Sequence, residues 1–223
     1  ADARVGFVGG INIIDDMHTP KQVPPRFDYA VRVEGPLLAE IHQAVARLWV
    51  LVTWTQFGRR RRANSIAVQA ARCGTQRAAF VIRDNFRHRN DIENGYLDAI
   101  AGAGREVVIA NAYFFPGISF RRALAEAAAR GVRVVLLLQG RVEYVLLHYA
   151  SRALYRYFLD AGVEIYEYHR SFLHAKVAVV DGRWATVGSS NIDPMSLLLA
   201  REANVMIEDA GFACDLRASL AEA

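Results

Sequence analysis

The sequence is short of lysine, of cysteine and of long apolar runs, and each shortage narrows what the protein can be. The formal net charge is +4, and since Lys21 and Lys176 are the only lysines, arginine supplies nearly all of the positive charge. An arginine excess favours anionic partners, such as phospholipid head groups or nucleic acid. Cys73 and Cys214 lie far apart and match no metal-ligand spacing, and two free thiols favour a reducing compartment.

No apolar run is long enough to form a transmembrane helix. The most apolar segment, LWVLVTW at 48–54, is far shorter than the roughly 20 residues that a membrane-spanning helix needs. The first ten residues also lack the basic and apolar regions of a signal peptide. If the protein handles lipids, we expect it to do so from the membrane surface, or through an anchor outside this chain.

Strand-like and helix-like segments alternate along the chain. Residues 132–140 are continuously apolar in their middle, which indicates a strand buried on both faces. Apolar residues recur at helical spacing in 35–54, 119–131 and 143–162. The alternation predicts an α/β fold, an α-β-α sandwich around a mixed, partly parallel sheet. The polar, arginine-rich stretch 55–76 is interpreted as the connection between two halves.

The segment HAKVAVVDGRWATVGSSN begins as a buried strand but carries polar side chains at fixed intervals. Residues two apart in a strand face the same way, so His174 and Lys176 are expected to project together. A neutral imidazole can attack phosphorus, and a charged one can protonate a leaving alkoxide. An ammonium group stabilises charge that grows on the phosphoryl oxygens. Asp181 closes the strand and is expected either to hold the imidazole in one tautomer or to pair with a basic group nearby.

The turn after the next short strand supplies further polar groups. Gly188 lets the backbone come close to a phosphate, and Ser189, Ser190 and Asn191 add hydroxyl and amide groups. Each feature alone is common: the aspartate could be a turn residue, and Gly-Ser-Ser-Asn an ordinary loop. The whole pattern, H-x-K-x4-D-x6-G-S-x-N, is much less expected by chance. It resembles the HKD motif of the phospholipase D superfamily at every diagnostic position.

A fainter copy of this motif begins at Asp2. Residues 2–13 align with 181–192 and match them in Asp, Arg, Val, Gly, Asn and Ile, which indicates an internal repeat. In the superfamily that the motif resembles, two such copies meet at a pseudo-twofold axis and form one active site. One histidine becomes a covalent phosphohistidine, and the other protonates the leaving alcohol and then activates the acceptor.

By this resemblance, the chain begins inside the first motif. The histidine of the first copy would lie seven residues before Asp2, and the residues that remain are Asp2, Gly9, Gly10 and Asn12. We expect residues 1–75 to hold the rest of an incomplete first repeat with the connection, and 76–223 to form a complete second repeat. Without the first His-x-Lys, the fragment alone is expected to be inactive.

Longer stretches narrow the resemblance to bacterial cardiolipin synthases, most closely those of the B type. It is carried by VIRDNFRHRNDIENGYLDAI, VVIANAYFFPG, GVRVVLLLQGR and the segment around the motif, and FDYAVRVEGP extends it into the first half. The family transfers a phosphatidyl group from one phospholipid to the free hydroxyl of another. Phosphatidylglycerol is the usual acceptor, and the B type points to phosphatidylethanolamine as the other lipid. The resemblance further implies no cofactor or metal, and peripheral contact with an anionic bacterial cytoplasmic membrane on its cytoplasmic side.

Weaker expectations concern residues around the motif. Family members place a site-lining aromatic where Tyr113 stands, although a core tyrosine is an equal alternative. Many of them follow the motif with a serine and Asn-x-Glu; here Ser196 and Glu202 are present, but Ala200 replaces that asparagine. Glu202 could orient a histidine across the site or be a surface carboxylate at a strand end.

Two arginine-rich stretches each have two interpretations. The segment RDNFRHR, residues 83–89, could hold a lipid phosphate or form a solvated basic loop. The run Arg59–Arg62 could rest on anionic lipid, where each basic residue contributes about 1 kcal/mol, or lie in a solvated linker.

Two other functions stay open. One is a phosphodiesterase or nuclease of the same superfamily, with the same histidine and an arginine-rich groove on DNA. Nucleic acid is the less favoured partner, because small nucleases of this kind have one motif and dimerise, whereas two copies are visible here. The other is an inactive, truncated repeat that only binds phosphate-bearing surfaces.

Overall fold

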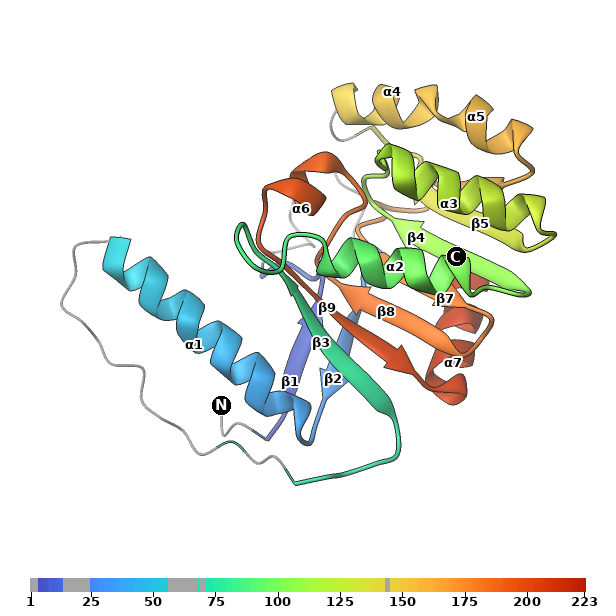
Figure 1. The fold of residues 1–223 in the computed structure, drawn as a ribbon. Coiled ribbons are helices and arrows are strands. Elements are labelled where there is room, and N and C mark those ends of the chain that lie inside the picture. Colours follow the sequence, from blue (N-terminus) through green and yellow to red (C-terminus); the bar gives the residue numbers. More distant parts are fainter. Residues whose placement is uncertain (1–3, 14–24, 56–67, 69–70, 143–144) are drawn as a thin grey trace.

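The computed structural model describes residues 4–13, 25–55, 68, 71–142 and 145–223 (Figure 1). Within these ranges the chain forms a two-stranded and a seven-stranded sheet. The small sheet pairs β1 (Gly6–Gly9) with β2 (Ala30–Val33) in antiparallel fashion. Asp2 and the arginine run 59–62 lie outside the described residues.

The large sheet is mixed, as the sequence predicts. Its strand order is β3-β9-β8-β7-β4-β5-β6. Strands β4, β5 and β6 run parallel, and the remaining neighbours are antiparallel. The strands are β3 (Arg77–Arg83), β4 (Glu106–Asn111), β5 (Arg133–Gln139), β6 (Glu164–Tyr168), β7 (Lys176–Val180), β8 (Trp184–Gly188) and β9 (Glu202–Glu208).

Helices cover both faces of this sheet (Figure 1). The helix predicted over 143–162 is divided at Leu154, whose backbone N–H donates to the carbonyl of Ser151 in a tighter turn. No helix among the described residues is long and apolar enough to cross a membrane. The helices are α1 (Leu37–Thr55), α2 (Asp91–Ala101), α3 (Ile118–Ala129), α4 (Val145–Ala153), α5 (Tyr155–Asp160), α6 (Pro194–Leu198) and α7 (Ala210–Ala221).

Two apolar cores form because the central strands are apolar on both faces. In β5, Val134 and Leu136 face one core with α2, α3 and α5, while Val135 and Leu137 face the other with α7. This confirms the prediction of a strand buried on both faces. Burial of each such side chain contributes about 1.5–3 kcal/mol, so the sheet is a rigid support for its edges.

The small sheet packs into the second of these cores. Val8, Val31 and Val33 lie in the same cluster as Val187 and α7. The segment that precedes β2 also runs beside the segment that precedes β7. The N–H of Phe27 donates to the carbonyl of Phe172, and the N–H of His174 donates to the carbonyl of Phe27, both at 2.8 Å. This pairing places the residues around 28 next to the start of β7.

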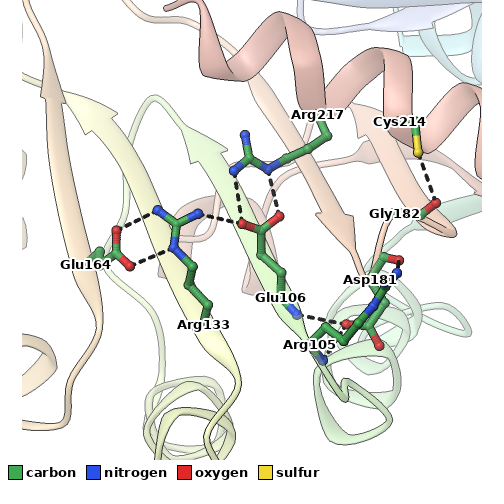
Figure 2. Close-up of polar contacts among 8 residues, drawn as sticks. All are labelled: Arg105, Glu106, Arg133, Glu164, Asp181, Gly182, Cys214 and Arg217. Carbon is green, nitrogen blue, oxygen red and sulfur yellow. Dashed lines mark hydrogen bonds and ion pairs between the residues drawn. The ribbon is translucent and has the colours of Figure 1, made fainter.

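The two edges of the large sheet differ in character. We call the edge where β3, β4, β5 and β8 end and β7 and β9 begin the motif edge, because His174 and Gly188 lie there. The opposite edge carries ion pairs (Figure 2). Arg133 binds both Glu164, at 2.8 Å, and Glu106, at 2.7 Å. Arg217 of α7 also binds Glu106 at 2.7 Å, which fastens that helix to β4.

Candidate active site

The site is centred on His174, which directly precedes β7. Its Nδ1 lies 2.7 Å from Oδ2 of Asp28, and the two side chains are 14% and 7% exposed. A carboxylate oxygen can only accept a hydrogen bond, so Nδ1 carries a hydrogen, and in the neutral imidazole the lone pair lies on Nε2. In its neutral form, the imidazole therefore offers Nε2 as a nucleophile or base.

Asp28 is the main functional candidate that the sequence analysis missed. Its other oxygen, Oδ1, accepts from the N–H of Tyr29 at 2.8 Å, so both carboxylate oxygens are engaged. Gly10 packs against this carboxylate: a Cβ there would lie 2.7 Å from Asp28 Oδ1. A Cβ on Gly9 would lie 2.3 Å from the carbonyl oxygen of Tyr29. The two glycines of the first motif copy thus allow Asp28 to reach His174.

Lys176 is the first residue of β7 and is almost fully buried. Its ammonium donates to the carbonyl of His174. Asn111, at the end of β4, is its partner across the sheet, and Asn111 Oδ1 accepts from the N–H of Ile192 at 3.1 Å. The Asn111 amide nitrogen is buried and has no partner among the described residues. This corner of the site therefore combines a buried cation with an amide donor.

The turn after β8 packs against the first residues of β9. A Cβ on Gly188 would lie 2.0 Å from Asn204 Oδ1, which itself accepts from the N–H of Ser190 at 3.4 Å. The Ser189 hydroxyl donates to Glu202 and accepts from the N–H of Ala203 at 3.1 Å. The Asn191 side-chain oxygen is buried and unpartnered among the described residues. The structure thus places the predicted turn on the motif edge and brings its Ser189 into contact with Glu202.

Glu202 is a partly buried member of this group. Burial raises the pKa of its carboxyl, while hydrogen bonds from Ser189 and Ser196 and the charge of Lys176 lower the pKa less strongly. Its position repeats that of Asp28. Ala30 pairs with Gly9 and Asn204 pairs with Gly188, so each acid stands two residues before the partner of a motif glycine. The two carboxyl groups are counterparts in the two motif copies.

Asp181 is separated from His174, so the first of its two predicted roles, holding the imidazole, is wrong. It follows the far end of β7, which at about 3.3 Å per residue is roughly 16 Å long. Its carboxylate accepts from the N–H groups of Arg105 and Glu106 (Figure 2) and from that of Gly104, each at 2.8 Å. Burial acts to raise the pKa of Asp181, but these hydrogen bonds outweigh it and the pKa is lowered.

The remaining predicted residues lie around this centre. Tyr113 follows β4 on the motif edge and is partly exposed, and Asn12 is exposed after β1. Arg83 of the basic segment 83–89 is buried, where its guanidinium donates to the carbonyls of Leu198 and Ala200, so it is not available to a lipid phosphate. No cluster of three or more potential metal ligands occurs among the described residues.

Comparisons with known proteins identify the family. Residues 96–222 match the family described as cardiolipin synthase, PLD-like domain, where PLD stands for phospholipase D. The chain is 43% identical over 228 residues to cardiolipin synthase B of Escherichia coli K12, which covers 98% of the chain and 52% of that relative. It is 30% identical to cardiolipin synthase A of Proteus mirabilis, over 96% of the chain and 44% of that relative. The chain thus spans about half the length of these relatives.

Solved structures agree on the fold. Phosphatidylserine synthase of Haemophilus influenzae superposes with a TM-score of 0.67 at 14% identity, over 93% of this chain and 56% of that one. Nuc, a phospholipase D family member of Salmonella typhimurium, gives a TM-score of 0.55 at 22% identity, over 66% of this chain and 93% of that one. The predicted superfamily and fold class are confirmed, and the chain belongs to the cardiolipin synthase family with a PLD-like domain.

Proposed function

We propose that the full-length protein is a phosphatidyltransferase that makes cardiolipin from two phospholipids through a phosphohistidine intermediate. The observation that carries the proposal is the buried bond between His174 Nδ1 and Asp28, which leaves the Nε2 lone pair of the neutral imidazole for attack, while the Lys176 ammonium binds the carbonyl of the same residue. An uncharged nitrogen nucleophile next to a buried ammonium suits attack on an anionic phosphodiester. The 43% identity to cardiolipin synthase B supports this substrate class.

In the first step, the Nε2 lone pair of His174 forms a bond to phosphorus, and the bond from phosphorus to the leaving alcohol oxygen breaks. The alkoxide takes a proton from a general acid, which we assign to the histidine of the first motif. In the second step that group removes the proton of an acceptor hydroxyl. The acceptor oxygen then attacks phosphorus, the nitrogen–phosphorus bond breaks, and His174 is restored. The reverse assignment of the two histidines gives the same products.

The other site residues stabilise charge and position groups in this scheme. Lys176 neutralises the phosphoryl oxygens, with the turn from Gly188 to Asn191 and the first-copy residues Gly9, Gly10 and Asn12 around the phosphate. Tyr113 lines the site beside β4. Since Glu202 is the counterpart of Asp28, we assign it to the histidine of the first motif. Asp181 has a structural role at the other end of β7, and Asp2 would be its counterpart.

We further propose that the chain contains the end of one PLD-like repeat, within 1–75, and a complete second repeat, 76–223. Phosphatidylglycerol would be the acceptor and phosphatidylethanolamine the other lipid, as the likeness to B-type relatives suggests. Because both lipids lie in a bilayer, the protein would contact an anionic bacterial membrane, for which we propose the cytoplasmic face. The proposed reaction uses no cofactor.

A transfer assay with the full-length protein tests the proposal. Labelled phosphatidylglycerol and phosphatidylethanolamine in vesicles should yield labelled cardiolipin and an acid-labile phosphoprotein. His174→Ala should abolish both while the protein stays folded, and His42→Ala on α1 serves as the matched control. Lys176→Arg should also fail, because a planar guanidinium does not replace a compact ammonium. Product formation by His174→Ala, or cleavage of DNA without any lipid product, would refute the proposed function.

A further inference from the structure

Large apolar side chains are exposed on the motif edge, next to the candidate active site. Phe86 lies in the loop after β3 and is 82% exposed. Met195 and Leu198 in α6 and Leu199 just after it are each more than half exposed. We call these four residues the rim. Because β9 begins with Glu202 three residues after Leu199, the rim lies immediately beside the catalytic turn.

The rim is held in shape by a buried arginine. The Arg83 guanidinium donates to Asn85 Oδ1 at 2.7 Å, to the carbonyl of Ala200 at 2.5 Å and to the carbonyl of Leu198. It thereby joins the loop that carries Phe86 to the segment that carries Leu198. Asp84 Oδ1 also accepts three backbone hydrogen bonds, from residues 86, 87 and 88, which fixes the loop. The apolar side chains are thus presented by an ordered surface.

Basic side chains flank the rim. Arg87, Arg89 and Arg201 are exposed, and none forms an ion pair with a described residue. The opposite edge differs, since Arg133 and Arg217 there are paired with glutamates (Figure 2). Exposed apolar residues with exposed arginines close by in sequence complement a bilayer that contains anionic lipid, where apolar groups reach the acyl boundary and guanidinium groups meet phosphates.

We propose that the rim docks the protein on an anionic phospholipid bilayer, with Phe86, Leu198 and Leu199 inserted at the acyl boundary. This inference rests on the proposed function, which places both substrates in a bilayer. Docking through the rim turns the motif edge toward the lipid phosphates, so that a head group can reach Ser189 and His174 without leaving the membrane. The charged opposite edge then faces water.

Vesicle binding tests the docking surface without any turnover. The full-length protein carries His174→Ala so that no lipid is consumed, and the probe is a vesicle of phosphatidylcholine with or without phosphatidylglycerol. The triple change Phe86→Ser, Leu198→Ser and Leu199→Ser should lower the partition coefficient at least about tenfold. A matched triple change of exposed apolar residues in α5 and β6 should leave it unaltered; these are Tyr157→Ser, Leu159→Ser and Tyr166→Ser.

The charge contribution is measured separately. Changing Arg87, Arg89 and Arg201 to Gln should weaken binding to vesicles with phosphatidylglycerol about fivefold per residue, equivalent to about 1 kcal/mol each, and leave binding to pure phosphatidylcholine unaltered. Because binding is read in a protein that cannot turn over, a failed transferase assay leaves this result intact. Equally, if the triple serine variant binds vesicles normally, docking through the rim is refuted, but the proposed transferase function is not.

A fluorescent reporter distinguishes the bilayer from a protein partner. An environment-sensitive dye on Leu198→Cys, with Cys73 and Cys214 replaced by serine, should shift its emission to shorter wavelength when vesicles are added, and the dye on Tyr166→Cys should not. No shift at 198 overturns the proposal. A shift that depends on protein concentration without vesicles, or a marked fall in melting temperature of the triple serine variant, would place the rim inside a protein interface and also overturn it.

Discussion

Replacement of Asp28 by Asn tests whether this carboxylate sets the state of His174. The carboxylate uses Oδ1 for the N–H of Tyr29 and Oδ2 for His174 Nδ1. In an asparagine, the carbonyl oxygen must face the N–H of Tyr29, which leaves the NH2 group facing Nδ1. Nδ1 then has to accept, so the hydrogen moves to Nε2 and the nucleophilic lone pair is lost.

The size of the effect follows from burial and charge. Both side chains are more than 85% buried, and the ring of His174 becomes positively charged as Nε2 bonds to phosphorus. A full carboxylate charge about 4 Å from that positive ring is worth about 4 kcal/mol at an effective dielectric of 20. Together with the tautomer change, this predicts a fall in kcat of about 1,000-fold to 10,000-fold, similar to the effect of the same substitution in a serine protease triad. The side-chain volume hardly changes, so the melting temperature should stay within a few degrees.

The assay is cardiolipin formation by the full-length protein, read as kcat at saturating lipid. Asp181→Asn is the matched control, since it makes the same change at the other end of β7. It should lower the free energy of unfolding by about 2 kcal/mol, because three backbone N–H groups lose a charged acceptor, yet the folded protein should keep its kcat. Retention of more than a tenth of the activity by Asp28→Asn, or catalytic loss in folded Asp181→Asn, would refute this reasoning.

Three further changes probe the site in other ways. The pKa of Glu202 is raised in the folded protein, so its contribution to stability is favourable below its unfolded pKa and is lost as pH rises through the folded pKa. Glu202→Gln should therefore have a higher melting temperature than the wild type at pH 8, though with lower activity. If the variant and the wild type showed the same dependence of melting temperature on pH, this prediction would be wrong. Gly10→Ala should push the Asp28 carboxylate aside and impair transfer with little effect on folding, whereas Gly117→Ala, where a Cβ meets nothing within 4 Å, should be silent in the same assay. Arg83→Met should cost about 3 kcal/mol in urea unfolding, because the carbonyls of Leu198 and Ala200 lose their charged donor; a cost below about 1 kcal/mol would show that the Arg83 hydrogen bonds are dispensable.

Most of the fold could be predicted because the apolar pattern of a buried strand lies within one short stretch of sequence. The apolar middle of 132–140 became β5, with alternate side chains in two cores, and the mixed sheet followed from alternating elements. The division of the helix over 143–162 could not be foreseen, since its apolar spacing continues through Leu154 and only the local turn interrupts it.

The candidate site was predictable only where its residues are contiguous. The turn from Gly188 to Asn191 lies within one short segment, and the structure sets it beside Glu202 as a group. Asp28 belongs to no local pattern, because its contact with His174 crosses 146 positions and depends on the pairing of Phe27 with the segment before β7. Asp181 is adjacent to the motif in sequence, but an extended strand carries it to the opposite edge.

The correspondence between Asp28 and Glu202 is not visible when the two motif copies are aligned by sequence alone. The motif copies align with an offset of 179, from Asp2 to Asp181, whereas the two acids are offset by 174. The difference of five residues lies in the loops between each motif glycine and the following strand, so an alignment without gaps cannot pair the acids. The strands restore the pairing, since Gly9 faces Ala30 as Gly188 faces Asn204. A carboxylate from the first copy thus holds the histidine of the second, and the site at His174 is complete only when segments of both copies pack together.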